Sequence, residues 1–216
     1  MSDQRFSPAF VRSVLMSQPS AADFEPLWPA HTPPNLTSEL HGYLPSQRTP
    51  AAVLVPLLER ESGLTVLLTQ RSETLREHAG QISFPGGRIE PSDASAWHAA
   101  LRETHEEIGL APDQVDFAGY LPDHLVGTGF RVTPAVAFVR LPLQLSLARD
   151  EVEEVFEVPL KHIFDAANRR LRTRRFGDTD VDFHDIDFQN RNIWGATAGM
   201  LQTLQRFMEN GGPAFE

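Results

Sequence analysis

The chain has 216 residues and a formal net charge of -10, with 29 acidic residues against 19 lysines and arginines. A chain of this length can bury one substantial core, so we expect a single domain with an additional segment at one end rather than two domains. The negative charge argues against nucleic acid as the main partner, because duplex binding depends on neutralising phosphates with lysine and arginine. The absence of cysteine excludes disulfides, zinc-thiolate sites and thiol nucleophiles.

The sequence also predicts a location. No apolar run approaches the length of a membrane span, and the N-terminus lacks the charged-then-apolar pattern of a signal peptide. The last three residues, Ala214-Phe215-Glu216, are not a peroxisomal signal. We therefore expect a cytoplasmic protein that does not act at a membrane.

The first fifty residues predict a short helix followed by an irregular arm. Ser7 and Pro8 start a helix that runs to about Met16. Residues 17–50 contain seven prolines, and they also contain Trp28 and Tyr43, which need a surface to pack on. We expect residues 1–50 to form an N-terminal helix and a proline-rich arm, packed on a domain that spans residues 51–216.

The other elements follow from apolar periodicity and turn residues. Strands are predicted at 51–58, 64–70, 115–120 and 132–139, with a turn at 61–63. Residues 150–166 mix acidic and apolar side chains and turn helical after Pro159. A hairpin across Gly177 and Asp178 is predicted to join strands at about 170–176 and 180–188, and a last helix covers about 196–210.

Residues 86–110 form a glycine turn followed by an amphipathic helix. Either Ser92 or Asp93 can cap this helix, and Gly109 ends it. At about 100° per residue, one arc of the helix is a core face; it holds Trp97, Leu101, Thr104 and Ile108. A second arc, above small alanine side chains, is acidic and holds Glu103, Glu106 and Glu107.

The acidic arc suggests a metal site. Like charges at i, i+3 and i+4 repel by about 0.2–0.5 kcal/mol per pair on an isolated helix. Mg²⁺ or Mn²⁺, hard ions that take carboxylate oxygens, would neutralise this charge. A solvated acidic stripe is the alternative interpretation. The Gly86-Gly87 turn and the single Arg102 among the acids favour the metal site.

This pattern resembles the Nudix box, Gx5Ex7REUxEExGU, in which U is aliphatic. The second half of the box matches residues 102–110, with Thr104 as the one poor aliphatic residue. The first half departs from the box, because Asp93 replaces the expected glutamate and eight residues rather than seven separate it from Arg102. The resemblance implies that Glu103 and Glu107 are the principal metal ligands, and that Glu106 ligates through water or accepts a bond from Arg102.

The segment directly before the box helix indicates a particular class of substrate. Residues 67–87, LLTQRSETLREHAGQISFPGG, resemble the signature of the coenzyme A pyrophosphatase branch of the Nudix family, LLTxR(S/A)x3Rx3Gx3FPGG, at every fixed position. Guanidinium forks suit phosphate, so Arg71 and Arg76 are candidate substrate contacts. The alternative for each is a surface ion pair with Glu73 or Glu77.

With later segments that are also similar to the family, the resemblance covers about residues 50–205. It implies an α+β fold, the Nudix α/β/α sandwich, in which a mixed sheet lies between the box helix and the C-terminal helix. It also implies hydrolysis of coenzyme A at its diphosphate, giving 3′,5′-ADP and 4′-phosphopantetheine. The Gly86-Gly87 turn would contact the substrate and offer a backbone carbonyl to the metal.

The general base is not fixed by the resemblance. One of the acids Glu151, Glu153 and Glu154 could reach metal-bound water, and a solvated acidic loop is the alternative. The 3′-phosphate of coenzyme A needs a cation. Arg71 and Arg76 are candidates, and so is a second cluster, in which solvated charges balancing nearby acids are the alternative; this cluster is Arg169, Arg170, Arg172, Arg174 and Arg175.

Two other functions stay open. One is broader Nudix hydrolysis of ADP-ribose, NADH or dinucleoside polyphosphates. The other is a Nudix-shaped module that senses a nucleotide without cleaving it, although the complete set of Glu103, Glu106 and Glu107 argues against this. In each case the expected partner is a small molecule, and a homodimer is compatible with the sequence.

Overall fold

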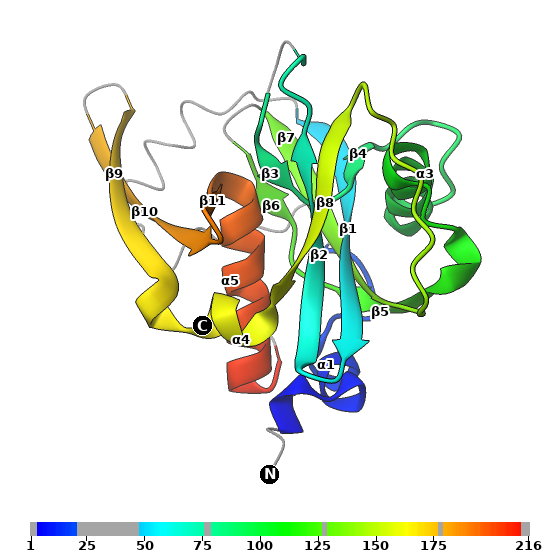
Figure 1. The fold of residues 1–216 in the computed structure, drawn as a ribbon, viewed down its shortest axis with the longest axis horizontal. Coiled ribbons are helices and arrows are strands. Elements are labelled where there is room, and N and C mark those ends of the chain that lie inside the picture. Colours follow the sequence, from blue (N-terminus) through cyan, green and yellow to red (C-terminus); the bar gives the residue numbers. More distant parts are fainter. Residues whose placement is uncertain (1–3, 21–47, 76–78, 127–128, 177–178, 213–216) are drawn as a thin grey trace.

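A mixed eight-stranded sheet with a long helix on each face organises the computed structural model (Figure 1). The structure describes residues 4–20, 48–75, 79–126, 129–176 and 179–212. The central pair of strands, β1 (Thr49–Arg60) and β7 (Phe130–Val139), is parallel. The remaining strands of this sheet pair antiparallel with their neighbours and comprise β2 (Gly63–Arg71), β3 (Ile82–Ser83), β4 (Gly86–Arg88), β5 (Val115–Tyr120), β6 (His124–Leu125) and β8 (Val152–Pro159).

The two long helices cover opposite faces of this sheet. Strand residues alternate between the faces. On β1, Ala52, Leu54 and Leu58 belong to the apolar cluster under α3 (Ala96–Ile108), whereas Val55 and Leu57 belong to the cluster under α5 (Gly195–Asn210). The predicted α+β fold, with a mixed sheet between the box helix and the C-terminal helix, is therefore confirmed.

Smaller elements complete the fold. Helix α1 (Pro8–Val14) begins at the predicted Ser7 cap but ends two residues before Met16, which instead forms a bridge with Tyr120. After β8 come α4 (Leu160–Phe164) and a second antiparallel sheet of β9 (Arg169–Phe176), β10 (Thr179–Phe188) and β11 (Arg191–Ile193). Within the described segments, short 3-10 turns lie at Gln4–Phe6, Pro112–Gln114 and Ala166–Asn168.

The strand β8 was not predicted. Its residues pair with β2, so that Phe156 lies opposite Leu68 and Val158 lies opposite Val66. The predicted hairpin turn at Gly177 and Asp178, and the arm from residue 21 to residue 47, lie outside the described residues. No helix in the described ranges is both long and apolar enough to cross a membrane.

Candidate active site

Strand β4 brings the glycine turn against the acidic face of α3. Gly86 lies opposite Val53 and Gly87 lies opposite Ala52 on β1. A β-carbon on Gly87 would come within 2.5 Å of the carboxyl carbon of Glu103, so any side chain there would displace this carboxylate. Gly86 adopts φ of 151°, a conformation that side chains rarely permit. Gly86 is thus required for the close approach of β4 to β1, where a β-carbon would lie 2.4 Å from the carbonyl oxygen of Ala52, and Gly87 leaves room for the Glu103 carboxylate.

The N-terminus of α3 differs from the prediction. Ser95 caps the helix, and its hydroxyl accepts a hydrogen bond from the amide of His98 at 3.3 Å. Neither Ser92 nor Asp93 is the cap, so that prediction was wrong. The predicted end at Gly109 is confirmed, because this residue has φ of 70° and its amide bonds to the carbonyl of His105.

Asp93 binds Arg102 instead. Its Oδ1 accepts from Nε of Arg102 at 3.1 Å and its Oδ2 accepts from Nη2 at 3.0 Å. The hydrogen bond from Arg102 lowers the pKa of the Asp93 carboxyl, although burial opposes the shift. This is the two-point geometry in which arginine binds carboxylates most strongly. The loop between Gly87 and α3 therefore delivers an acid to Arg102 despite the extra residue in the spacing.

Arg102 connects the loop to the acidic arc. Its Nη1 donates to Glu103 at 2.9 Å and to Glu106 at 3.2 Å, while its Nη2 also donates to the carbonyl of Arg88 at 3.1 Å. The hydrogen bond to Asp93 raises the pKa of the guanidinium above its ordinary value, and Glu103 adds to this shift. Arg102 therefore stays positively charged and holds the Glu103 carboxylate in place.

The three glutamates of the arc lie in different environments. The side chain of Glu107 is 6% exposed, that of Glu103 is 20% exposed and that of Glu106 is 57% exposed. Glu107 accepts a hydrogen bond from the amide of Gly86 at 3.2 Å. Burial raises its pKa to about 7, and the nearby charges of Glu103 and Glu151 add to the shift. Burial also raises the pKa of Glu103.

These environments fit a divalent metal. Within the described ranges, no three acidic or histidine side chains form a ready-made metal-binding group. Negative charge nevertheless gathers around the partly buried Glu103 and the buried Glu107: Glu106 and Glu151 act on Glu103, and Glu103 and Glu151 act on Glu107. Oxygen donors one helical turn apart suit hard ions such as Mg²⁺ and Mn²⁺. An ion there would offset the cost of burying these carboxylates.

Arg71 lies beside this pair, at the end of β2. Its Nη1 is 3.8 Å from Oε1 of Glu107, while its buried Nε has no hydrogen-bond partner. In the part of the chain that is described, no ion pair joins Arg71 to Glu73. Arg76 and Glu77 lie outside the described residues. Arg71, which the sequence predicts to contact the substrate, thus lies next to Glu107, a candidate metal ligand.

The structure distinguishes the three base candidates. Glu151 is held beside β2, because its carbonyl accepts from the amide of Ser72 at 2.8 Å, and its charge acts on Glu103 and Glu107. Glu154 forms an ion pair with Arg191 at 2.5 Å, which links β8 to the second sheet. Glu153 is exposed. Glu151 is therefore the candidate that the fold brings to the site.

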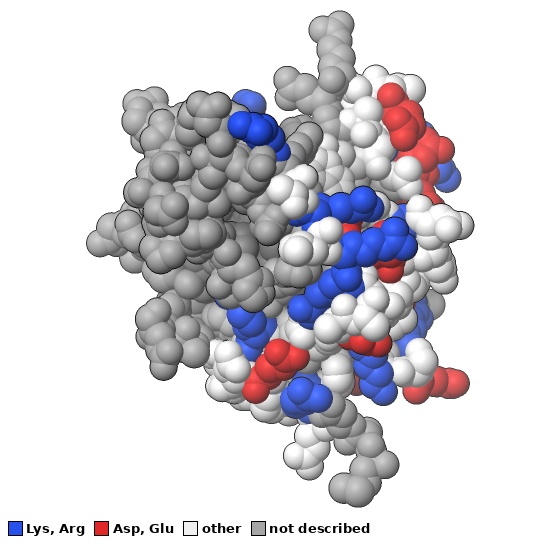
Figure 2. All heavy atoms as spheres, turned by 90° about the vertical axis from the view of Figure 1, so that its left-hand side faces the viewer, with Lys and Arg blue, Asp and Glu red and all other residues white. Residues whose placement is uncertain are grey.

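Two of the five arginines of β9 form ion pairs with acids of β10. Arg170 pairs with Asp187 at 2.5 Å and Arg172 pairs with Asp185 at 2.8 Å. Figure 2 faces this side of the molecule, where basic and acidic side chains lie next to one another. This supports the interpretation of these two arginines as charges that balance nearby acids. Arg169 donates to Gln205, and the side chain of Arg174 is not described.

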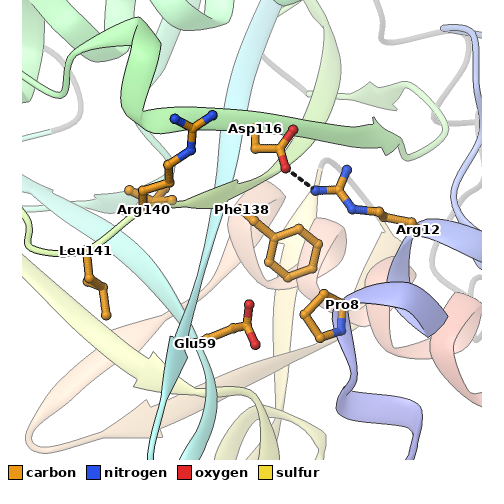
Figure 3. Close-up of a pocket in the computed structure, with 8 residues that line it drawn as sticks. Pro8, Arg12, Glu59, Asp116, Phe138, Arg140 and Leu141 are labelled. Atoms are coloured by element: carbon orange, nitrogen blue, oxygen red, sulfur yellow. Dashed lines mark hydrogen bonds and ion pairs between the residues drawn. The ribbon is translucent and has the colours of Figure 1, made fainter.

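A pocket of about 590 Å³ opens at the other end of β1 (Figure 3). Its floor is Phe138, and its wall includes Arg12 of α1, which pairs with Asp116 at 2.6 Å. Glu59 lines this pocket, whereas the glycine turn pairs with Ala52 and Val53 near the opposite end of the strand. None of the predicted site residues lines it.

Comparison with known proteins shows which family the chain matches. The NUDIX domain family matches residues 48–177. The chain is 43% identical over 162 residues to the uncharacterized Nudix hydrolase NudL of Cronobacter sakazakii, covering 71% of this chain and 80% of that one. It is 42% identical over 165 residues to the protein of the same name from Citrobacter koseri, covering 73% and 81%.

Solved structures show the same fold. A Nudix hydrolase from M. smegmatis, RenU, superposes with a TM-score of 0.53 and 20% identity, over 76% of this chain and 88% of that one. A MutT protein from Methanosarcina mazei gives a TM-score of 0.50 and 23% identity, over 77% and 97%. The family match and the relatives indicate a pyrophosphohydrolase, in a family whose members generally use divalent metal ions. The chain belongs to the Nudix hydrolase family.

Proposed function

We propose that the chain hydrolyses the diphosphate bond of coenzyme A, and of coenzyme A derivatives, to 3′,5′-ADP and 4′-phosphopantetheine, with Mg²⁺ or Mn²⁺ held by Glu103 and Glu107. Glu106 is the further candidate ligand, through water. One observation carries the substrate assignment: the segment that resembles the coenzyme A branch, residues 67–87, adjoins the acidic helix. Its Arg71 lies 3.8 Å from Glu107, and its Gly86 amide donates to the same carboxylate.

The chemistry follows from the charges. A diphosphate resists attack because its negative oxygens repel a nucleophile, and a bound divalent ion would withdraw that charge and lower the pKa of water. Glu103 and Glu107 would hold the ion, while Arg102 keeps Glu103 oriented from behind. Arg71, with an unpartnered buried Nε, would bind a phosphate oxygen of the substrate.

We propose Glu151 as the general base that removes a proton from the attacking water. Glu151→Gln should lower kcat by about a hundredfold or more with KM little changed, which is the usual size of a general-base contribution. Glu153→Gln and Glu154→Gln are matched controls from the same segment and should have mild effects. Three mild effects would place the base elsewhere, with Glu106 as the next candidate.

The activity is tested by product analysis. Purified protein is incubated with coenzyme A and Mg²⁺, and the products are identified by mass spectrometry, with a chelator and Glu107→Gln as controls. We expect 3′,5′-ADP and 4′-phosphopantetheine in equal amounts only in the metal-containing wild-type reaction. Cleavage of ADP-ribose or NADH but not of coenzyme A would indicate the broader Nudix activity. Nucleotide binding without any cleavage would indicate a sensor.

We further propose that the enzyme acts in the cytoplasm on this small-molecule substrate. The reaction needs neither a nucleic acid nor a membrane, and the net charge of -10 disfavours binding to phosphate-rich polymers. Cell fractionation tests the location. Light scattering of the purified protein tests the homodimer that the sequence leaves open.

A further inference from the structure

A cation–π pair lies one residue beyond the glycine turn. The guanidinium carbon of Arg88 is 5.5 Å from the centre of the Phe130 ring, which joins the end of β4 to the start of β7. Arg88 is exposed and Phe130 is partly buried. Both residues flank the first residues of β1, since Arg88 lies opposite Ala51 and Phe130 lies opposite Thr49.

Arg88 is fixed to the candidate active site through its backbone. Its carbonyl accepts from Nη2 of Arg102 at 3.1 Å, so a change of the Arg88 side chain leaves this bond available. In the described ranges, no carboxylate pairs with the Arg88 guanidinium, whereas Arg71 and Arg102 of the same site both pair with glutamates. Arg88 is therefore an exposed cation that rests on an aromatic ring beside a diphosphate site.

The two faces of β4 separate these groups. Gly87 faces Glu103 on α3, whereas Arg88, the next residue, contacts Phe130, which packs on the cluster that contains α5. Consecutive α-carbons are about 3.8 Å apart. Among the described strands, β4 pairs only with β1, so its other edge is open. A nucleotide whose diphosphate lies at Glu103 can extend around this edge, across the width of one residue, to the Arg88 side chain.

We propose that Arg88 and Phe130 form the platform on which the nucleobase of the substrate stacks, with the base on the guanidinium plane and the ring of Phe130 behind it. The inference rests on the proposed function only in taking a nucleotide diphosphate as substrate. Nucleobases stack on aromatic rings and on arginine planes. The guanidinium is planar, delocalised and weakly hydrated, so covering it with a base costs little desolvation.

Product inhibition tests the platform, because the two products carry different halves of coenzyme A. Arg88→Ala should raise the KM for coenzyme A and the inhibition constants of both 5′-AMP and 3′,5′-ADP by about tenfold, the usual scale of one base stack. The inhibition constant of 4′-phosphopantetheine should stay unchanged. Arg88→Lys, which keeps the charge but not the plane, should behave like Arg88→Ala, and Phe130→Leu should weaken the same two nucleotides.

Arg140→Ala is the matched control, since Arg140 is an exposed arginine directly after the other end of β7. The proposal would be overturned if the inhibition constants of the two nucleotides were the same for Arg88→Ala as for Arg140→Ala. Weaker binding of 3′,5′-ADP with unchanged 5′-AMP would also overturn it, because Arg88 would then contact the 3′-phosphate. If the wild type does not cleave coenzyme A, the proposed function is wrong, but the platform proposal is not yet tested. Calorimetry of 5′-AMP against ribose 5-phosphate then still tests the platform, and equal losses for both ligands would refute it.

Discussion

Glu107 is the residue whose burial most strongly affects the electrostatics of the site. Its pKa is raised from 4.5 to about 7, chiefly by burial. The folded state therefore binds this proton more tightly than the unfolded chain does. By linkage, the free energy of unfolding is highest below pH 4.5, with respect to this group, and falls as the pH rises through 7.

Glu107→Gln should remove this pH dependence. In metal-free protein we expect the variant to melt at a higher temperature than the wild type at pH 8 and at a similar temperature near pH 4.5, because glutamine carries no charge to bury. Turnover should fall by more than about a hundredfold, because that is already the upper range for groups that only support the ligands of a metal site, and Glu107 is itself a proposed ligand. Thermal melts between pH 4.5 and 8 measure the first effect. A wild type more stable than the variant at pH 8 without metal would contradict it.

Asp93 is the residue that replaces the box glutamate. Asp93→Asn breaks its charged two-point contact with Arg102 and should cost about 1.5–3 kcal/mol in the free energy of unfolding. The value of kcat/KM should fall about ten- to a hundredfold, because Glu103 loses its oriented partner. Urea unfolding and steady-state kinetics measure both effects.

Asp116→Asn provides the control for this variant. Asp116 also pairs with an arginine, but its side chain is 56% exposed, so its loss should cost less than about 1 kcal/mol. Equal effects of the two variants on stability and turnover would mean that Asp93 contributes no more than a surface charge.

Among the elements, the strands with uniform apolar patterns could be predicted from the sequence. β1, β2, β5 and β7 lie within two residues of the ranges expected from their apolar runs and bounding turns. β8 could not be predicted, because its glutamates interrupt the alternation of apolar and polar residues that is typical of a strand. Glu154 and Glu157 are neutralised by Arg191 and Arg60 from distant segments, and these partners are visible only in the folded chain.

The candidate site could be predicted only in part, because it too depends on contacts between distant segments. The spacing placed Glu103, Glu106 and Glu107 on one arc of the helix, but their different burial depends on how β4 packs against α3. The cap was ambiguous because more than one polar residue precedes the helix, and the contact with Arg102 decides that Asp93 is not the cap. The position of Glu151 depends on the pairing of β8 with β2.

The attachment of β8 gives a prediction at the same scale. Glu157 accepts hydrogen bonds from Nε of Arg60 at 3.0 Å and from the hydroxyl of Thr65 at 2.6 Å, and the bond from Arg60 lowers its pKa. A lowered pKa adds stability above the ordinary value of 4.5 that is lost as the pH falls through the folded-state pKa.

Glu157→Gln should therefore destabilise the fold by about 1 kcal/mol at pH 7, allowing for the partial exposure of the pair. The difference should shrink in acid, where the wild-type carboxyl is protonated as well. Urea unfolding at pH 7 and at pH 3 measures it. An unchanged difference at the two values would assign the effect to packing rather than to charge.

For the whole molecule, metal binding should act as a stabilising ligand. An ion that binds only the folded chain raises the free energy of unfolding, by about 2.7 kcal/mol when its concentration is a hundred times its dissociation constant. We expect Mg²⁺ or Mn²⁺ to raise the melting temperature of the wild type, and a chelator to reverse the change. Glu107→Gln should respond little, and an equal response of the variant would place the ion elsewhere.

The proposed function requires a site that prefers coenzyme A to related nucleotides, and the ratio of their kcat/KM values measures this preference. Coenzyme A differs from dephospho-coenzyme A by the 3′-phosphate. Arg170 and Arg172 are already paired with acids, so the remaining candidate cations for this phosphate are Arg71, Arg76, Arg169, Arg174 and Arg175. A charge-assisted bond is worth about 1.5–3 kcal/mol, which corresponds to about ten- to a hundredfold in kcat/KM. With Mg²⁺, we predict kcat/KM for coenzyme A at least about tenfold above the values for dephospho-coenzyme A and ADP-ribose. Equal values for the three substrates would contradict the account and leave a general nucleoside diphosphate hydrolase.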